Sequence, residues 1–306
     1  MQRTLKGKAV FLGQGLHSGR PVRMSVFPAP ANHGITFRRS DAGATGEILP
    51  ARWDKVEQTP LCTRLVGATG DSVSTVEHVM AALAGLGIHN AMITLDGPEV
   101  PILDGSAAPF VRGILAAGVE ALAAPARVIE ILEPIEVRRG DAVARLDPAD
   151  GVEMSFDISF PDAAIGTQSR ALNLANGAFI RDLCDSRTFC RQSDVDAMHA
   201  AGLALGGTLE NAVVVDGDRI VTPGGLRHSD EPVRHKMLDA LGDLAMAGGP
   251  ILGRYSGHKA GHALTNELLR QLFARPEAWR MIDCDPELAA RLPGVGVSVS
   301  DLALCA

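Results

Sequence analysis

The chain has 306 residues, of which 46% are hydrophobic and 21% are charged, so it can form one large domain or two domains of ordinary size. A net charge of −7 and a content of only two Trp and one Tyr argue against a nucleic-acid partner held by phosphate contacts and base stacking. The polar N-terminus, the lack of any stretch of roughly 18 apolar residues, and five cysteines without a CxxC pair favour a cytoplasmic protein with reduced thiols and no membrane span.

The first half of the chain opens with short runs of β-forming residues. Strands separated by Gly-, Pro- or Asn-containing turns are expected at 8–11, 22–27 and 35–38. Ser74 and Glu77 have the spacing of a capping box, which predicts that an Ala/Leu-rich helix begins here and ends near Gly85. A buried strand over 90–97 is predicted to follow, and residues 104–109 are expected to lead into a second helix that ends at about 117.

The second half is predicted to start after an Ala/Pro-rich linker at 121–126. Strands are expected at 126–137, 142–146 and 152–160, and a helix near 195–201. Residues 211–217 resemble residues 90–97, because both segments run from Asn-Ala through apolar residues to Asp-Gly. The pattern predicts an α+β fold of two similar α+β domains, 1–122 and 127–306, packed with the active site in the cleft between them.

His235 and Asp239 stand four residues apart in a segment expected to be helical, so their side chains lie on one face. Two such N/O ligands are half of a catalytic zinc site, which usually has three protein ligands and a water. Taken alone, the pair is also explained by a surface ion pair or a contact within the helix.

Glu77 and His78 are adjacent in an otherwise apolar helix, where both are costly to bury without partners. Neighbouring helical residues diverge by about 100°, so one of them can bind a metal while the other faces a substrate. A Glu favoured at the start of a helix beside a hydrogen-bonded core histidine is the alternative.

Five multi-residue motifs resemble one known family and occur in that family's order. They are residues 75–78 with 81–88, 104–111, 186–189, 234–244 and 261–264. From residue 5 to about residue 272 the chain resembles the UDP-3-O-acyl-N-acetylglucosamine deacetylases, the zinc amidases of lipid A biosynthesis in Gram-negative bacteria. The resemblance implies hydrolysis of the N-acetyl group of UDP-3-O-[(3R)-3-hydroxyacyl]-N-acetylglucosamine to UDP-3-O-acyl-glucosamine and acetate, the committed step of that pathway.

The same resemblance implies a ligand set of His78, His235 and Asp239 for one catalytic Zn²⁺. Three N/O ligands leave a position open for water, and Fe²⁺ is an alternative ion in the cell.

Four further residues receive catalytic roles from the resemblance. Glu77 corresponds to the general base, and His262 corresponds to the general acid. Asp243 corresponds to the carboxylate that orients the acid, and Thr188 to the hydroxyl that hydrogen-bonds the developing oxyanion.

Predicted substrate contacts are less specific. Lys236 directly follows a predicted ligand in the helix and is therefore expected to point about 100° away from it. It corresponds to the residue that meets the diphosphate as a point charge. The others are Phe189, Leu61, Cys62 and Thr63 around the sugar and metal, His17 as a further contact, and Val195, Leu203, Ala204, Ala212 and Val214 along an apolar passage for the 3-O-acyl chain. A buried structural thiol is the alternative for Cys62, and ordinary core is the alternative for the apolar set. Cys190 stands where many relatives have Gly, and its side chain would narrow or stiffen the loop below the metal.

Two other functions remain as alternatives. One is a zinc amidase acting on another N-acetylated nucleotide sugar. The other is a non-catalytic sugar-nucleotide binding protein, against which the presence of all five predicted metal and acid–base residues argues. The expected partner is a UDP-linked acylated amino sugar, and the expected oligomeric state is a monomer.

Overall fold

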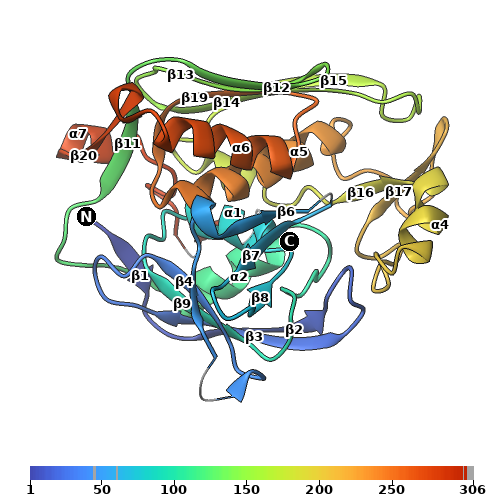
Figure 1. The fold of residues 1–306 in the computed structure, drawn as a ribbon, viewed down its shortest axis with the longest axis horizontal. Coiled ribbons are helices and arrows are strands. Elements are labelled where there is room, and N and C mark those ends of the chain that lie inside the picture. Colours follow the sequence, from blue (N-terminus) through green and yellow to red (C-terminus); the bar gives the residue numbers. More distant parts are fainter. Residues whose placement is uncertain (44–45, 60, 299, 302–306) are drawn as a thin grey trace.

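The computed structural model describes residues 1–43, 46–59, 61–298 and 300–301. A β-sheet from each half of the chain forms an outer layer, and helices lie between the two layers (Figure 1). These helices are α1 (Glu77–Gly85), α2 (Ala108–Ala117), α5 (Glu231–Leu244) and α6 (His262–Phe273). The predicted α+β fold is confirmed.

The first sheet is built by the N-terminal half of the chain. Its strand order is β2 (Ala9–Gln14), β3 (Pro21–Pro28), β9 (Ala91–Leu95), β4 (Ile35–Arg39) and β5 (Ile48–Pro50). Only the β9–β4 pair is parallel. In β9 the side chains of Ala91, Ile93 and Leu95 are buried, and the residues between them are partly exposed. This alternation is typical of a strand with one face against helices.

The C-terminal half repeats this arrangement. Part of its sheet has the order β12 (Ile135–Arg139), β13 (Ala142–Asp147), β19 (Ile251–His258), β14 (Val152–Ser159) and β15 (Thr167–Asn173). Again one pair, β19–β14, is parallel and the others are antiparallel. In the N-terminal half, α1 precedes the central strand β9 and α2 follows it. In the C-terminal half, α5 precedes the central strand β19 and α6 follows it. The two halves therefore share one topology.

The sequence similarity between residues 90–97 and 211–217 does not identify the strand of the second half that is equivalent to β9. Residues 211–217 contain β17 (Val213–Asp216), which lies in a small separate sheet between β16 (Phe189–Arg191) and β18 (Arg219–Ile220). The topological equivalent of β9 is β19, whose sequence does not resemble it. The domain boundaries proposed at 122 and 127 stay a prediction.

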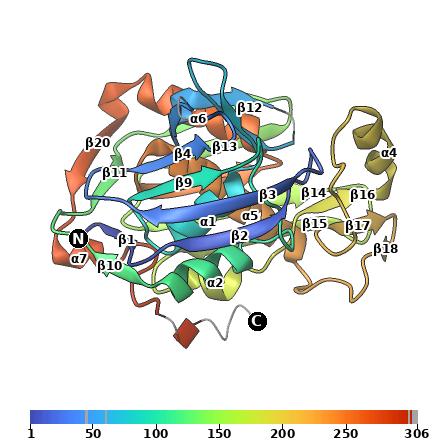
Figure 2. The ribbon, with the colours of Figure 1, turned by 90° about the horizontal axis from the view of Figure 1, so that it is seen from below.

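Additional elements extend each half. A three-stranded sheet of β6 (Val56–Gln58), β7 (Thr63–Val66) and β8 (Ser72–Val73) precedes α1. In the second half, β16, α4 (Gln192–Ala200), β17 and β18 form a lobe that projects from one end of the molecule (Figure 2). The remaining elements are β1 (Arg3–Leu5), β10 (Val119–Ala121), β11 (Arg127–Ile131), α3 (Ala178–Asp182), β20 (Trp279–Asp283), α7 (Pro286–Ala289) and the 3-10 helices Trp53–Lys55, Ala245–Ala247 and Pro276–Ala278.

Two local predictions are wrong. The segment predicted as one strand over 126–137 is two strands, β11 and β12, which join different neighbours. Pro134 lies between them and cannot donate a ladder hydrogen bond. The capping box is also absent: the residue that caps α1 is Val76 rather than Ser74, it makes no side-chain hydrogen bond, and Thr75 before it has a φ of 58°.

The two halves approach each other closely where α1 packs against α5. A Cβ atom on Gly242 of α5 would lie 2.0 Å from the carbonyl oxygen of Glu77 in α1. Only glycine therefore permits this contact. The close approach places the start of α1 against the face of α5 that carries His235 and Asp239.

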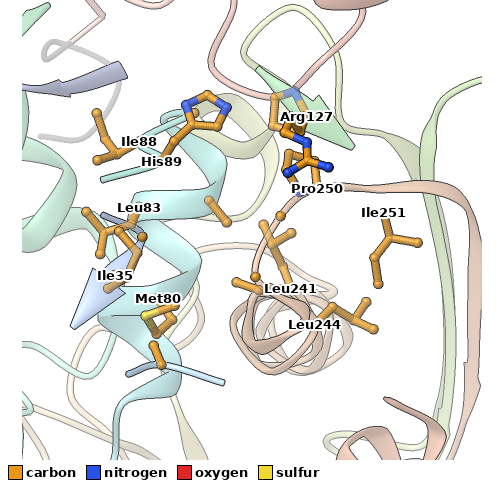
Figure 3. A pocket seen from close by; sticks show the side chains of 18 of the residues that line it. Ile35, Met80, Leu83, Ile88, His89, Arg127, Leu241, Leu244, Pro250 and Ile251 are labelled. Atoms are coloured by element: carbon orange, nitrogen blue, oxygen red, sulfur yellow. The ribbon is translucent and has the colours of Figure 1, made fainter. Parts of the chain in front are cut away.

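A cavity of about 360 Å³ lies farther along the same two helices (Figure 3). Its walls come from both halves and include Met80 and Leu83 of α1 and Leu241 and Leu244 of α5. None of the predicted metal or catalytic residues lines it. This cavity is thus distinct from the predicted site, although that site also receives residues from both halves.

Among the described residues, no helix combines the length and the apolar character that crossing a membrane requires.

Candidate metal centre

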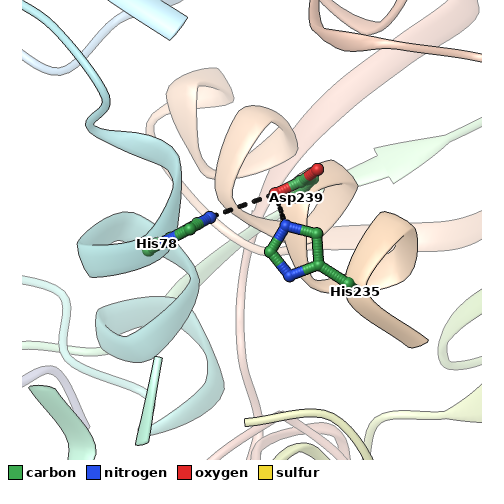
Figure 4. A group of neighbouring side chains, drawn as sticks. All are labelled: His78, His235 and Asp239. Atoms are coloured by element: carbon green, nitrogen blue, oxygen red, sulfur yellow. Dashed lines mark ion pairs between the residues drawn. The ribbon is translucent and has the colours of Figure 1, made fainter. Parts of the chain in front are cut away.

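His78, His235 and Asp239 come together at the contact of α1 and α5 (Figure 4). One potential ligand atom from each lies within 4.8 Å of the other two. The Nε2 atoms of His78 and His235 are 3.4 Å and 3.2 Å from the same carboxylate oxygen, Oδ1 of Asp239. All three residues are buried, with at most 5% of their surface exposed.

The hydrogen bonding of His235 and Asp239 favours a bound cation at this position. Nδ1 of His235 lies 3.0 Å from the carbonyl oxygen of Ser186, which can only accept, so this nitrogen carries the proton. When the ring is neutral, as metal binding requires, the lone pair of Nε2 therefore faces Asp239. Oδ1 of Asp239 is buried without a hydrogen-bond partner in the described structure. A lone pair facing an unpartnered carboxylate oxygen is unfavourable unless a cation lies between them.

Charges around Asp239 favour its ionised form. Burial alone would raise the pKa of this carboxyl, but His235 and Lys236 outweigh burial and hold the pKa well below its usual range. Burial lowers the pKa of His78. A neutral imidazole and an ionised carboxylate are the protonation states that metal binding requires.

Glu77 precedes His78 at the start of α1 and is 3% exposed. Its Oε2 atom accepts a hydrogen bond of 3.0 Å from the backbone amide of Thr63. Burial raises the pKa of Glu77 to about 7, with His262 opposing the shift and Asp239 adding to it. A carboxyl group with this pKa is suited to exchange protons near neutral pH.

His262 is the first residue of α6, and its Nδ1 lies 2.8 Å from Oδ2 of Asp243. Its Nε2 is 3.9 Å from Oδ2 of Asp239. Burial would lower the pKa of His262, but the Asp243 carboxylate outweighs burial and raises the pKa to about 9. The structure thus brings an imidazolium and a carboxyl group to the same metal-binding group.

The side chain of Lys236 lies closer to the predicted metal ligands than its position in the helix suggests. Its Nζ is 2.9 Å from Oδ2 of Asp239. The expectation that it points away from the ligands is therefore wrong, because its long side chain curls back along α5. A role for Lys236 toward a diphosphate stays a prediction.

Thr63 forms hydrogen bonds with two side chains of the candidate site, and its predicted place in the pocket wall stays a prediction. Its amide donates to Glu77, and its hydroxyl donates to Oδ1 of Asp243. Both polar groups are thus occupied by neighbouring side chains of the candidate site.

Among the other residues predicted to contact the substrate, Phe189 lies beside a predicted metal ligand. The ring of Phe189 is 6.3 Å from that of His235, edge to face. Cys62 is buried, which raises its pKa to about 11, whereas Leu61 is exposed. The backbone of Thr188 bonds to Gly105 and Val213, and the role predicted for its hydroxyl stays a prediction.

The five residues predicted to line an acyl passage belong to the projecting lobe or its connections. Ala204, Ala212 and Val214 are buried, and Val195 and Leu203 are half-buried. Cys190 pairs with Val214 across β16 and β17. The passage itself stays a prediction.

Two partners of the site carry no signal in the sequence. One is the carbonyl oxygen of Ser186, since any residue supplies a carbonyl. The other is Glu99, whose Oε1 accepts from the amide of His17 and the hydroxyl of Thr75, each at 2.9 Å. Glu99 thereby connects the loop of His17 to the residue that leads into α1.

A buried His-His-Asp group flanked by a carboxyl group and an imidazolium is typical of metal-dependent hydrolases. The family model described as UDP-3-O-acyl N-acetylglycosamine deacetylase matches residues 2–274. A relative from Phenylobacterium zucineum, called UDP-3-O-acyl-N-acetylglucosamine deacetylase, is 49% identical over 94% of this chain and 98% of its own length. One from Shewanella frigidimarina with the same name is 45% identical over 94% of each chain. The chain belongs to the UDP-3-O-acyl-N-acetylglucosamine deacetylase family.

Proposed function

We propose that this chain removes the N-acetyl group from UDP-3-O-[(3R)-3-hydroxyacyl]-N-acetylglucosamine and releases UDP-3-O-acyl-glucosamine and acetate, the committed step of lipid A biosynthesis. The observation that carries the proposal is the buried Oδ1 of Asp239, which faces two histidine nitrogens without a hydrogen bond. Membership of the deacetylase family supplies the substrate class.

His78, His235 and Asp239 would hold one Zn²⁺, with Fe²⁺ as the alternative ion in the cell. A bound Zn²⁺ polarises a carbonyl and lowers the pKa of a water toward about 7. Glu77 takes the proton of the attacking water, because burial gives its carboxyl a pKa of about 7.

His262 acts on the leaving amine. Its pKa of about 9 keeps the ring charged at neutral pH. With Nδ1 held by Asp243, the Nε2 proton is the one available to the amine nitrogen when the C–N bond breaks. Before that step the positive charge also stabilises the oxyanion, together with the Thr188 hydroxyl.

The remaining substrate contacts follow from charge and polarity. Lys236 would move from Asp239 to the diphosphate once a divalent cation satisfies that carboxylate. Phe189 covers one side of the sugar beside His235. The lobe formed by β16, α4, β17 and β18 would receive the acyl chain. We further propose that the enzyme is a cytoplasmic monomer.

One metal analysis of anaerobically purified protein, paired with a deacetylation assay in detergent, tests the proposal. Acetate release from the UDP-sugar that carries the 3-O-acyl group, at about one metal ion per chain, is expected. Equal activity on UDP-N-acetylglucosamine without the acyl group would instead indicate an amidase for another nucleotide sugar. Full turnover by metal-free protein would contradict the proposal that a metal ion is required for the reaction.

A further inference from the structure

We infer that Thr63 is a positioning residue that aligns the base Glu77 and, through Asp243, the acid His262. The inference rests on the roles proposed for those two residues. Both hydrogen-bond donors of Thr63 are directed at protein carboxylates, and the predicted contact of Thr63 with the substrate stays a prediction.

Thr63 is the first residue of β7 and is 3% exposed. Its amide nitrogen lies 3.0 Å from Oε2 of Glu77. Its carbonyl accepts a hydrogen bond from the amide of Val76, the residue immediately before Glu77. Two backbone groups of Thr63 therefore fix the start of α1 and the orientation of the Glu77 carboxylate.

The hydroxyl of Thr63 acts on the other half of the molecule. It donates to Oδ1 of Asp243, whereas Oδ2 of the same carboxylate accepts from Nδ1 of His262. With a separate donor on each oxygen, the Asp243 carboxylate cannot rotate without breaking one bond. Loss of the hydroxyl would leave the plane of Asp243, and hence the direction of His262, set by a single contact.

Thr63→Val tests this role because Val keeps the shape and the backbone donors but removes the hydroxyl. We expect kcat to fall by roughly 10- to 100-fold, the cost of a misplaced catalytic group, with unchanged KM and metal content. Thr63→Ser should restore kcat to within about threefold. Thr4→Val is the matched control, because Thr4 is also buried with a bonded hydroxyl but contacts Asn90 and Ala29, away from the site.

A double-variant cycle separates positioning from general packing. If Thr63 acts on the acid through Asp243, Thr63→Val should cost little further activity in an Asp243→Asn background. Equal losses in both backgrounds, equal losses for Ser and Val, or an unchanged kcat in Thr63→Val would each overturn the inference.

A readout independent of turnover is the NMR signal of the Nδ1 proton of His262 in metal-free protein, assigned by its loss in His262→Ala. It should shift in Thr63→Val and return in Thr63→Ser. An unshifted signal in Thr63→Val overturns the inference. Inactivity of the wild-type protein toward the acylated UDP-sugar would contradict the proposed function instead, and the NMR signal would still test the role of Thr63.

Discussion

Asp243 holds His262 by a hydrogen bond of 2.8 Å between Oδ2 and Nδ1, although the two residues lie on different helices. The bond leaves Nε2 of His262 facing the metal-binding group, 3.9 Å from Oδ2 of Asp239. Asp239 and Asp243 lie one turn apart on α5. One face of α5 therefore supplies metal ligands and also fixes the acid, so the two functions should be separable by substitution.

His262→Ala should keep the metal and lose activity. The ring is held by Asp243 rather than by the three ligand residues, so one metal ion per chain is expected to remain. Loss of a general acid typically costs about 10²- to 10⁴-fold in kcat. Metal analysis and steady-state kinetics measure the two effects. His258→Ala, an exposed histidine at the end of β19, is the control and should leave both values unchanged. Loss of metal from His262→Ala would make this residue a ligand.

Asp239→Ala should show the opposite pattern. Its Oδ1 atom faces both histidine nitrogens, so removing the carboxylate leaves two ligands and the uncompensated charge of Lys236 beside them. We expect the metal-to-protein ratio to fall well below one after dialysis, with activity falling in proportion. Excess zinc should recover part of the activity. A variant that retains one tightly bound ion would exclude Asp239 from the ligand set.

The repeated fold could be predicted from the sequence, but its internal correspondence could not. Each half shows strands before helices, which suffices to predict two α+β units. The equivalent central strands β9 and β19 share position and pairing direction, not sequence, because a buried strand is satisfied by many apolar residues. The resemblance between residues 90–97 and 211–217 therefore does not mark equivalent strands, and the two Asp-Gly ends differ, since Gly217 but not Gly97 has a positive φ.

The metal-binding group was predictable because helical periodicity and family motifs both mark it. The contacts that orient the metal-binding group could not be predicted from the sequence. Thr63 is 180 residues from Asp243 in the sequence, and the carbonyl of Ser186 is a backbone group, so neither pairing produces a local pattern. The reach of Lys236 to Asp239 depends on the rotamer of a long side chain, which helical spacing does not determine.

The pH dependence of kcat/KM should be bell-shaped. Activity needs ionised Glu77 and protonated His262, so it should rise as Glu77 loses its proton and fall as pH passes about 9, the pKa of His262. The pKa of Glu77 is about 7 in the metal-free protein, and a bound cation would move the acidic limb lower. Measuring kcat/KM from pH 5 to 10 tests both limbs. A basic limb that persists unchanged in His262→Ala would refute its assignment to this residue.

Glu77→Gln should stabilise the metal-free protein while it inactivates the enzyme. The folded-state pKa of Glu77 is raised from 4.5 to about 7, mainly by burial, so the native protein holds this proton more tightly than the unfolded chain does. Its contribution to stability is therefore lost as pH rises from about 4.5 through about 7. Gln is neutral at every pH and still accepts the hydrogen bond from Thr63.

At pH 8 the free energy of unfolding of metal-free Glu77→Gln should exceed that of the wild type by up to about 3 kcal/mol, and the gap should narrow at pH 5.5. Denaturant unfolding at both pH values measures it. Glu120→Gln, at an exposed position, is the control and should show no gap at either pH. Bound metal should reduce the gap, because a cation beside Glu77 favours the carboxylate. A variant less stable than the wild type at pH 8 would mean that the fold stabilises the ionised form of Glu77, and the raised pKa would then be wrong.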